Sequence, residues 1–527
     1  MGLAQKWLTL PTSRASSPGD WTGHLPRAGA DMLAHVEIDV VENDELCFTP
    51  ATQLSDWIRA RSISPVEIVE AVLKRIDRLN PRLNAFLAVT HDLASQSARE
   101  AEGRAMRGEL RGPLDGIPYS IKDLEPVAGV RTTFGSKWFE HHVPTQDGAV
   151  AGRLRSTGMA LLGKTNTPNF GHKDMCDNLL GPPCRNPWQT DRTSGASSGG
   201  AGAAVAAGLG PPAHGSDGGG SIRIPAALCG VFGLKPSFGR VPYWPSADLW
   251  AARSHNGPIA RTVRDAALLL RAMAGPDSRD PLTIDAAPED YVAACEGDLK
   301  GLRVVWSADL GYAAVDTEVR RVAEAAARRF AALGCQVEER DPGWPDPDAF
   351  HRVIYEVGVA ARQSERIAEH PDWIEPSLLE MFDHARGVSG IEHSHALMAR
   401  TTFYEHARQF FETCDLLLTP QMPVGAWSVD SGPAEINGRP TPSMFDRLPF
   451  TFPFNLTGQP AASVPCGFTS DGLPVGLQIV GRWHADALVL RAAAGFEAAQ
   501  PWAQHRPSLD EVQDVLETPS EERTAHA

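Results

Sequence analysis

Residues 191–221 read DRTSGASSGGAGAAVAAGLGPPAHGSDGGGS, a composition found nowhere else in the chain. Two loops rich in glycine and serine, at 194–200 and 215–221, flank a run of small residues, Ala201–Ala207, that is expected to be helical. Glycines at this density let the backbone approach another group closely or adopt φ > 0. Two flexible turns would leave the same pattern, but a structural protein rarely needs two such loops so near each other. The segment therefore indicates a functional site.

Around this segment, short apolar runs alternate with stretches of helical periodicity. Strands are predicted at Ala85–Val89, Ile117–Ile121, Met159–Leu162, Leu302–Trp306 and Val475–Val480. Helices are predicted at 148–157, 263–274, 316–333 and 485–499, and the spacing from Gln53 onward is also helical, with Pro65 placed after a serine as at a helix start. This alternation indicates an α/β protein with a largely buried sheet.

The chain has 527 residues, enough for one large domain or several smaller ones. Lys plus Arg minus Asp plus Glu is 49 − 65 = −16, which argues against binding nucleic acid or anionic membranes through bulk charge. No apolar run approaches the roughly 20 residues of a membrane helix, and the N-terminus lacks a secretion or myristoylation signal. We therefore expect a cytoplasmic protein with no nucleic-acid or membrane partner.

Eight cysteines are scattered along the chain without C-x-x-C pairs. In so long a chain this spacing favours buried or free thiols over a zinc site or a disulfide scaffold. Residues 1–35 show no sustained period and are expected to form a loose extension, within which Met32 is an alternative start to Met1. Residues 506–527 are expected to be a C-terminal tail.

The second loop ends in Gly218-Gly219-Gly220-Ser221, so a hydroxyl follows three unhindered backbone N–H groups. An oxyanion hole needs such donors, aimed at the oxygen that becomes negative when a carbonyl is attacked. Serine is a poor nucleophile without a base. Neither loop contains a histidine, although His172 and His255 could approach in space.

Lys122 is another possible base, because it follows the predicted strand 117–121 and α/β sites cluster at the carboxyl ends of strands. Desolvation there would lower the lysine pKa and leave the amine able to accept a proton. Taken alone, Lys122 would be read as a surface lysine.

Several ordered motifs together resemble the amidase-signature family. Gly112–Pro118 with Ile121-Lys122-Asp123 resembles its lysine motif, 195–200 its serine- and glycine-rich signature, and 215–225 its nucleophile segment. Ser197 and Ser221 stand 24 residues apart, as in the family. Further similar segments are 163–166, 185–188, 229–236, 455–458 and 472–478. The resemblance covers about residues 50–500.

The resemblance implies one large domain at 45–505, a mixed β-sheet core flanked by helices. It implies a hydrolase that cleaves carbon–nitrogen bonds of amides or carbamates through a Ser221 acyl-enzyme, with Ser197 relaying protons to Lys122. The oxyanion would be held by the backbone N–H groups of Gly218, Gly219, Gly220 and Ser221, and the loop by Asp217, Arg223 and Ser198. No metal or organic cofactor is expected, and the only partners expected are a small-molecule amide and, in a homodimer, a second copy.

The first loop departs from the family pattern Pro-Gly-Gly-Ser-Ser-Gly-Gly, because Ser194 and Ala196 replace the proline and the second glycine. The family resemblance also implies a cis peptide bond between Ala196 and Ser197. We expect this bond to place the Ser197 hydroxyl within hydrogen-bonding reach of both Lys122 and Ser221.

Three alternatives compete with this interpretation. Gly195–Gly199 matches the nucleophile elbow G-x-S-x-G, but the polar segment 185–192 before it does not form the required strand. His393-Ser394-His395 is an H-x-H, yet it lies in a helical-looking stretch and not after a strand. The third alternative is the amidase-like subunit of a tRNA-dependent amidotransferase. Its nucleophile segment usually has glutamine where Ile224 stands, and it has Asp-Gln in place of 255–258.

The sequence does not name the substrate. The segment 340–450 is expected to be the variable, helical, pocket-forming region. Most of its aromatic and methionine side chains are expected to be core and a few to line an apolar pocket, the set being Phe350, Tyr355, Trp373, Met381, Phe382, Phe403, Tyr404, Phe410 and Phe411. Other pocket candidates are Phe170, His172, Met175, Cys176 and Trp244. Linear and aryl amides are the expected substrates, and carbamates, cyclic or oligomeric amides and fatty amides remain open.

Overall fold

The computed structural model describes residues 43–251 and 253–509. The predicted extension 1–35, both candidate starts, and residues 510–527 of the predicted tail lie outside the described residues. The domain boundaries 45–505 stay a prediction. None of the helices in the described ranges is long and apolar enough to span a lipid bilayer.

One sheet of eleven strands organises the described residues, in the order β1-β3-β2-β4-β6-β5-β12-β13-β9-β7-β8. Parallel pairs occur near both edges, and the strands between them are antiparallel. The strands are β1 (Phe86–Val89), β2 (Pro118–Lys122), β3 (Ala160–Thr165), β4 (Pro212–Asp217), β5 (Phe232–Lys235), β6 (His255–Ala260), β7 (Arg303–Trp306), β8 (Gln336–Glu339), β9 (Leu416–Pro420), β12 (Ala461–Phe468) and β13 (Pro474–Gly481). The expected mixed α/β architecture is confirmed.

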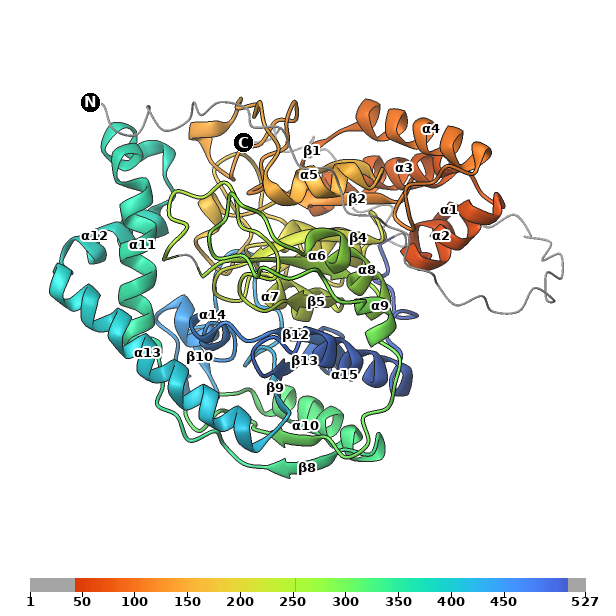
Figure 1. Ribbon diagram of the computed structural model, residues 1–527. Coiled ribbons are helices and arrows are strands. Elements are labelled where there is room, and N and C mark those ends of the chain that lie inside the picture. The colour runs from red at the N-terminus through yellow and green to blue at the C-terminus, as the bar shows by residue number, and fades with distance from the viewer. Residues whose placement is uncertain (1–42, 252, 510–527) are drawn as a thin grey trace, which may run out of the picture. The chain divides into compact units, whose positions relative to one another are not determined.

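Helices flank this sheet, and Figure 1 shows it passing between them from β1 to β8. They are α1 (Asn43–Phe48), α2 (Ala51–Ala60), α3 (Pro65–Leu83), α4 (His91–Arg107), α5 (Ala149–Ser156), α6 (Gly199–Ala206), α7 (Arg223–Cys229), α8 (Val263–Met273), α9 (Tyr291–Ala294), α10 (Thr317–Ala332), α11 (Asp348–Glu369), α12 (Pro376–Arg386), α13 (Gly390–Thr413), α14 (Pro453–Thr457) and α15 (Asp486–Ala499). Four short 3₁₀ helices in the described residues are η2 (Lys137–Phe139), η3 (Asn169–Gly171), η4 (Pro371–Trp373) and η5 (Met444–Arg447). A two-stranded ribbon joins β10 (Glu435–Ile436) to β11 (Arg439–Pro440).

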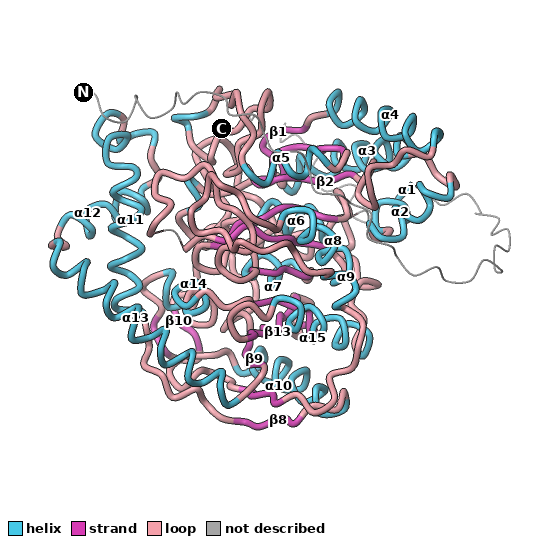
Figure 2. Tube along the Cα trace, in the orientation of Figure 1, coloured by secondary structure: helices cyan, strands magenta, loops and turns pink. Residues whose placement is uncertain are grey.

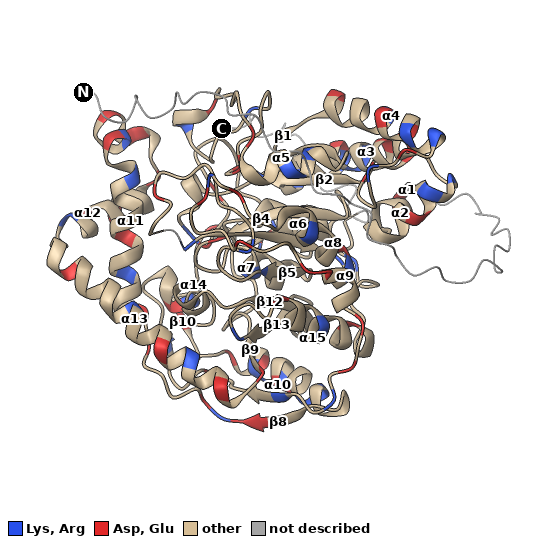
Figure 3. Ribbon diagram, viewed as in Figure 1, with Lys and Arg blue, Asp and Glu red and all other residues tan. Residues whose placement is uncertain are grey.

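Local sequence explains where these elements begin. Helix α3 starts at Pro65, as predicted, because Ser64 caps it and Glu67 closes a capping box with Ser64. Strands β2, β3, β4 and β9 are buried along their whole length, as expected for strands in the interior of a sheet covered by helices. Charges of both signs lie along α11 and α13 (Figure 3), whereas the central strands carry few.

Two groups of connections position the site. Loops gather between the central strands and the long helix α11 (Figure 2). The first glycine-rich segment leads into α6, and the second begins in β4 and continues into the turn that follows it. Helices α11, α12 and α13 come from the predicted region 340–450, which is helical as expected and also contains β9. Four of its nine predicted core or pocket side chains are buried, namely Met381, Phe403, Phe410 and Phe411, and the other five are partly exposed, so the prediction that most are core was wrong.

Candidate active site

Lys122 ends strand β2 and is completely buried. Its Nζ donates to Ser197 Oγ at 2.8 Å, to Ser216 Oγ at 3.0 Å and to the Ser216 carbonyl at 3.2 Å. Burial lowers its pKa to about 7, although electrostatic interactions with Cys176 and Asp217 act in the opposite direction. At neutral pH a substantial fraction of this amine is therefore unprotonated and able to accept a proton.

The first glycine-rich loop places Ser197 beside Lys122. The Ala196–Ser197 peptide bond is cis, as predicted, and α6 starts two residues later at Gly199. The predicted hydrogen bond to Lys122 is present. The predicted hydrogen bond between the Ser197 and Ser221 hydroxyl groups is not found among the described residues. The two side chains nevertheless line one cavity.

Ser198 ties the two loops together. Its Oγ donates to the Ser216 carbonyl at 3.1 Å and accepts from the Ser216 N–H at 3.2 Å, while its own N–H donates to the Ser221 carbonyl at 3.1 Å. The relative position of Ser197 and Ser221 is thus fixed by hydrogen bonds between their neighbours in sequence.

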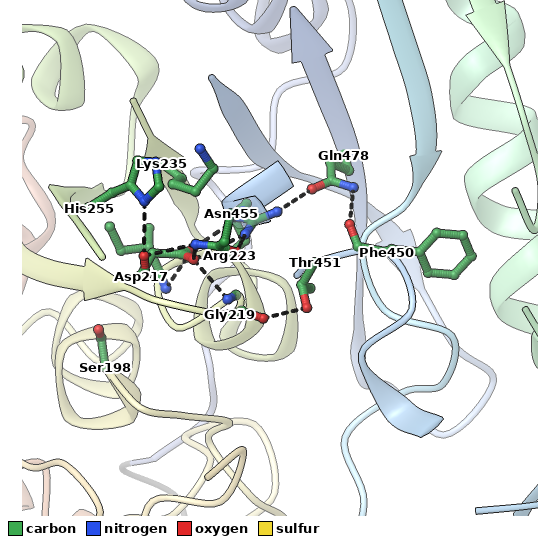
Figure 4. Close-up of polar contacts among 12 residues, drawn as sticks. Ser198, Asp217, Gly219, Arg223, Lys235, His255, Phe450, Thr451, Asn455 and Gln478 are labelled. Atoms are coloured by element: carbon green, nitrogen blue, oxygen red, sulfur yellow. Dashed lines mark hydrogen bonds and ion pairs between the residues drawn. The ribbon is translucent and has the colours of Figure 1, made fainter. Parts of the chain in front are cut away.

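A buried network holds the second loop (Figure 4). Arg223 donates from Nε and Nη2 to the two carboxylate oxygens of Asp217, both at 3.0 Å, and reaches Gln478 Oε1 and Asn455 Oδ1, both at 2.8 Å. Asn455 in turn donates to the Asp217 carbonyl at 2.9 Å and to its carboxylate at 2.8 Å. Burial by itself raises the pKa of Asp217, but the charge and hydrogen bonds of Arg223 bring it well below its usual range.

The predicted oxyanion donors divide into two kinds. The Gly220 N–H donates to Asp217 Oδ1 at 2.8 Å, so its assignment as a free oxyanion donor was wrong. The N–H groups of Gly219 and Ser221, by contrast, have no acceptor among the described residues. Gly220 also has φ +130°, and a Cβ there would lie 2.6 Å from Thr451 Cβ, which is why glycine is needed at that turn.

The cavity above these groups has a volume of about 260 Å³. Ser197, Ser216, Gly218, Gly219 and Ser221 line it. Of the sequence-predicted pocket residues, Phe170 and His172 line it. Helix α11, from the predicted variable region, contributes His351, Tyr355, Val359, Arg362 and Gln363. Two cations, Arg253 and Lys173, and two carboxylates, Asp174 and Asp248, also line it.

Met175, Cys176 and Trp244 do not line the cavity, so these three pocket predictions differ from the structure. Cys176 is buried against the start of α6, where a Cβ on Gly199 would lie 2.5 Å from it. The Trp244 ring lies under the Arg279 guanidinium, 4.4 Å from it. Residues 170–174 line the cavity in succession, and the lining stops before Met175 and Cys176.

The two histidines considered as bases are engaged elsewhere. His172 Nδ1 and Nε2 each lie 2.7 Å from a partner, the Asn169 carbonyl and Ser377 Oγ, and burial lowers its pKa to about 4. His255 Nδ1 lies 3.2 Å from the Asp217 carbonyl. His395, of the H-x-H, lies exposed on α13, and residues 166–194, directly before the G-x-S-x-G, contain no strand.

Sequence reasoning missed several groups that the structure brings to the site. Ser216 accepts a hydrogen bond from Lys122. Asn455 and Gln478 accept hydrogen bonds from Arg223. Thr451 Oγ1 donates to the Gly219 carbonyl at 2.6 Å. Asn455 and Gln478 lie in segments that matched the family pattern, which was a usable signal.

All eight cysteines are buried and free, as predicted. In the described ranges, His, Cys, Asp and Glu side chains nowhere gather in threes that could bind a metal ion.

The mixed sheet and the cavity define an α/β protein in which a buried lysine amine lies beside a serine hydroxyl group. The chain belongs to the Amidase family, whose model matches residues 67–490. An acylamidase of Rhodococcus erythropolis is 41% identical over 466 residues, which cover 87% of this chain and 97% of that protein. A solved bacterial aryl acylamidase of the amidase signature family superposes with a TM-score of 0.82 at 32% identity, covering 87% of this chain and 97% of that one.

A relative of another kind is a glutamyl-tRNA(Gln) amidotransferase subunit of Carboxydothermus hydrogenoformans. It is 34% identical, and the match covers 88% of this chain and all, 100%, of that protein. The predicted family is thus confirmed, and the chain is an enzyme that hydrolyses amides.

Proposed function

We propose that this enzyme hydrolyses acyl amides through an ester between the substrate acyl group and Ser221, with Ser197 as proton relay and Lys122 as base. The observation that carries the proposal is the contact of 2.8 Å between the buried Lys122 amine and Ser197 Oγ, beside a cavity that Ser221 also lines. A desolvated lysine replaces the histidine of a Ser-His-Asp triad.

In the first half of the reaction, Ser221 Oγ attacks the amide carbonyl and forms the carbon–oxygen bond. Its proton passes to Ser197 as the Ser197 proton passes to Lys122. The relay needs the two serine hydroxyls to come within hydrogen-bonding distance, and catalytic hydrogen bonds often tighten only when substrate is bound. The negative oxygen is held by the N–H groups of Gly219 and Ser221, with Gly218 beside them.

In the second half, the carbon–nitrogen bond breaks as the proton on Lys122 returns through Ser197 to the leaving amine. A water molecule then attacks the ester and loses its proton along the same path. Ser221 regains its hydroxyl, the carboxylic acid leaves, and Lys122 ends as a neutral amine. This sequence consumes one amide and one water and requires no other reactant.

The substrate class follows from the relatives and the cavity. Acylamidase and aryl acylamidase relatives favour linear and aryl amides, with carbamates as chemically similar alternatives. Phe170, Tyr355 and Phe445 provide apolar surface for such groups. Cytoplasmic location and a monomeric or dimeric state remain part of the proposal.

The test is to label the protein with a fluorophosphonate and to find the modified residue by peptide mass spectrometry. We expect the label on Ser221, and we expect Ser221→Ala to abolish both labelling and turnover of an acetanilide. Ser394→Ala, which changes an exposed serine of α13, serves as the matched control. Label on Ser197 with Ser221 unmodified would overturn the assignment of the nucleophile.

A second candidate is the tRNA-dependent amidotransferase, which the full-length match to the Carboxydothermus hydrogenoformans protein favours. Against it stands Ile224, which is buried, lines the cavity, and occupies the position of the glutamine usual in that subunit. Native mass spectrometry of the purified protein distinguishes the two. A complex with further subunits would support the second candidate, and efficient hydrolysis by the isolated chain supports the first.

A further inference from the structure

Arg253 is a buried cation without a counter-ion. Its side chain lines the cavity, it is only 9% exposed, and its Nε has no hydrogen-bond partner. No carboxylate of the described residues forms an ion pair with it. Burying an ionised group without a partner is costly, so buried charges in proteins are normally paired. An unpaired one that faces a cavity is therefore suited to a partner that comes from outside the chain.

The neighbours of Arg253 do not remove its charge. The guanidinium lies over the Tyr355 ring, 4.8 Å from its centre, which is a weak cation–π contact and leaves its N–H groups free for an acceptor. Burial lowers the pKa of Arg253 to about 10, so the group remains protonated at neutral pH. Arg362 also lines the cavity and adds a second positive charge.

The two carboxylates of the cavity do not serve as its counter-ions. Asp174 accepts from Arg447 at 2.8 Å and 3.1 Å and is neutralised by that pair. Asp248 is exposed and accepts from the N–H groups of Trp250 and Ala251, both at 3.0 Å. Lys173, by contrast, is already paired with Asp177 and Glu375. The positive charge that stays available belongs to Arg253 and Arg362.

A second buried group in the same wall is also unpartnered. His351 is 1% exposed, it lines the cavity, and neither of its ring nitrogens has a hydrogen-bond partner. Burial keeps its pKa well below the usual value, so the ring is neutral and offers one N–H. Arg253 and His351 both contact Tyr355, so their donors lie around one aromatic ring.

The backbone places Arg253 near the reacting groups. Strand β6 pairs His255 with Asp217, so the chain before β6 runs beside the oxyanion loop. A Cβ on Gly218 would lie 3.1 Å from Ser254 Oγ, the residue next to Arg253. A substrate with an anionic group bound to Arg253 would therefore need only a short linker between that group and the scissile amide.

We propose that the preferred substrate of this enzyme is an amide that carries a carboxylate, bound by Arg253 with Arg362 and His351 beside it. This inference rests on the proposed amide hydrolysis and adds the substrate class. The carboxylate belongs either to the acyl half or to the amine half of the substrate. The guanidinium fork suits a planar carboxylate, with which it forms two parallel hydrogen bonds.

The experiment compares matched pairs of amides. Succinic mono-4-nitroanilide and its carboxamide analogue test the acyl half, and 4-acetamidobenzoate and 4-acetamidobenzamide test the amine half. We expect the wild-type enzyme to prefer the carboxylate of one pair by about 10- to 100-fold in kcat/KM, the range of a charged hydrogen bond. Arg253→Met should bring this ratio close to one, and Arg253→Lys should retain part of it. Arg340→Met is the matched control, because Arg340 also lies over a ring, that of Phe410, but does not line the cavity.

Binding gives a second measurement that does not depend on turnover or on the identity of the nucleophile. The same four compounds are titrated calorimetrically into Ser221→Ala protein, with and without the additional substitution Arg253→Met. The ratio of affinities should match the ratio of kcat/KM when Arg253 is present and approach one in the double variant. A wild-type preference that survives Arg253→Met, or the absence of a preference in both pairs, would overturn the inference. Failure of the proposed mechanism is distinct, because it appears as turnover that persists in Ser221→Ala.

Discussion

Two groups of buried polar side chains beside the cavity, one behind Ser221 and one around Tyr355 of α11, satisfy their hydrogen bonds in opposite ways. Behind Ser221, Arg223 satisfies Asp217 and is itself satisfied by Asn455 and Gln478, all completely buried. Around Tyr355, Arg253 and His351 are also buried, yet among the described residues the Arg253 Nε and both ring nitrogens of His351 have no partners. The first group fixes its geometry with internal hydrogen bonds, which catalytic groups require. The second leaves its hydrogen-bonding capacity for a ligand.

The largest expected effect sharpens the first half of this comparison. Lys122→Arg should lower kcat by about 10³-fold or more, because a guanidinium does not deprotonate in a protein and cannot act as base. Lys74→Arg, on the exposed face of α3, should leave kcat unchanged. Steady-state kinetics on an anilide, with the circular dichroism spectrum as a check of folding, measures this. Turnover near the wild-type value in Lys122→Arg would exclude the lysine as base.

The next prediction compares the two buried arginines directly by stability. Arg223→Met leaves Asp217 charged and buried without its main partner, so it should lower the free energy of unfolding by about 3–5 kcal/mol. Arg253→Met removes an unpaired buried charge and should cost nothing or stabilise the protein. Thermal unfolding of both variants, at one protein concentration and heating rate, gives the order of their Tm values. Equal losses of Tm would mean that Arg253 has a structural partner.

The groups around Ser221 were far easier to predict from sequence than the surroundings of Arg253. Lys122, Ser197 and Asp217 lie in motifs of a few residues, and Lys122 directly follows a predicted strand, so their chemistry could be read locally. Arg253 carries no such signal, because its setting is created by Tyr355 and His351, about a hundred residues later. A sequence motif also does not determine the direction in which a backbone N–H points. For this reason Gly220 was assigned to the oxyanion hole, although its N–H donates to Asp217.

The smallest expected effect concerns the pH dependence of the reaction. With the Lys122 pKa lowered to about 7, the amine is protonated below that pH, so kcat/KM should fall about tenfold per unit there and level off above it. Ser216 Oγ accepts from the Lys122 amine at 3.0 Å, and a hydrogen bond to the charged form favours that form. Ser216→Ala should therefore lower the pKa further and move the midpoint of the profile to lower pH by less than about one unit.

The Ser216 carbonyl and Ser197 Oγ still hold the amine in that variant, so the plateau of kcat/KM at high pH should fall by less than about tenfold. Profiles of kcat/KM from about pH 5 to about pH 10 measure both quantities, because kcat/KM reports the pKa values of the free enzyme. Ser394→Ala again provides a control in which neither changes. A midpoint that moves upward in Ser216→Ala, or a wild-type profile without a rise near pH 7, would mean that the titrating base is not Lys122.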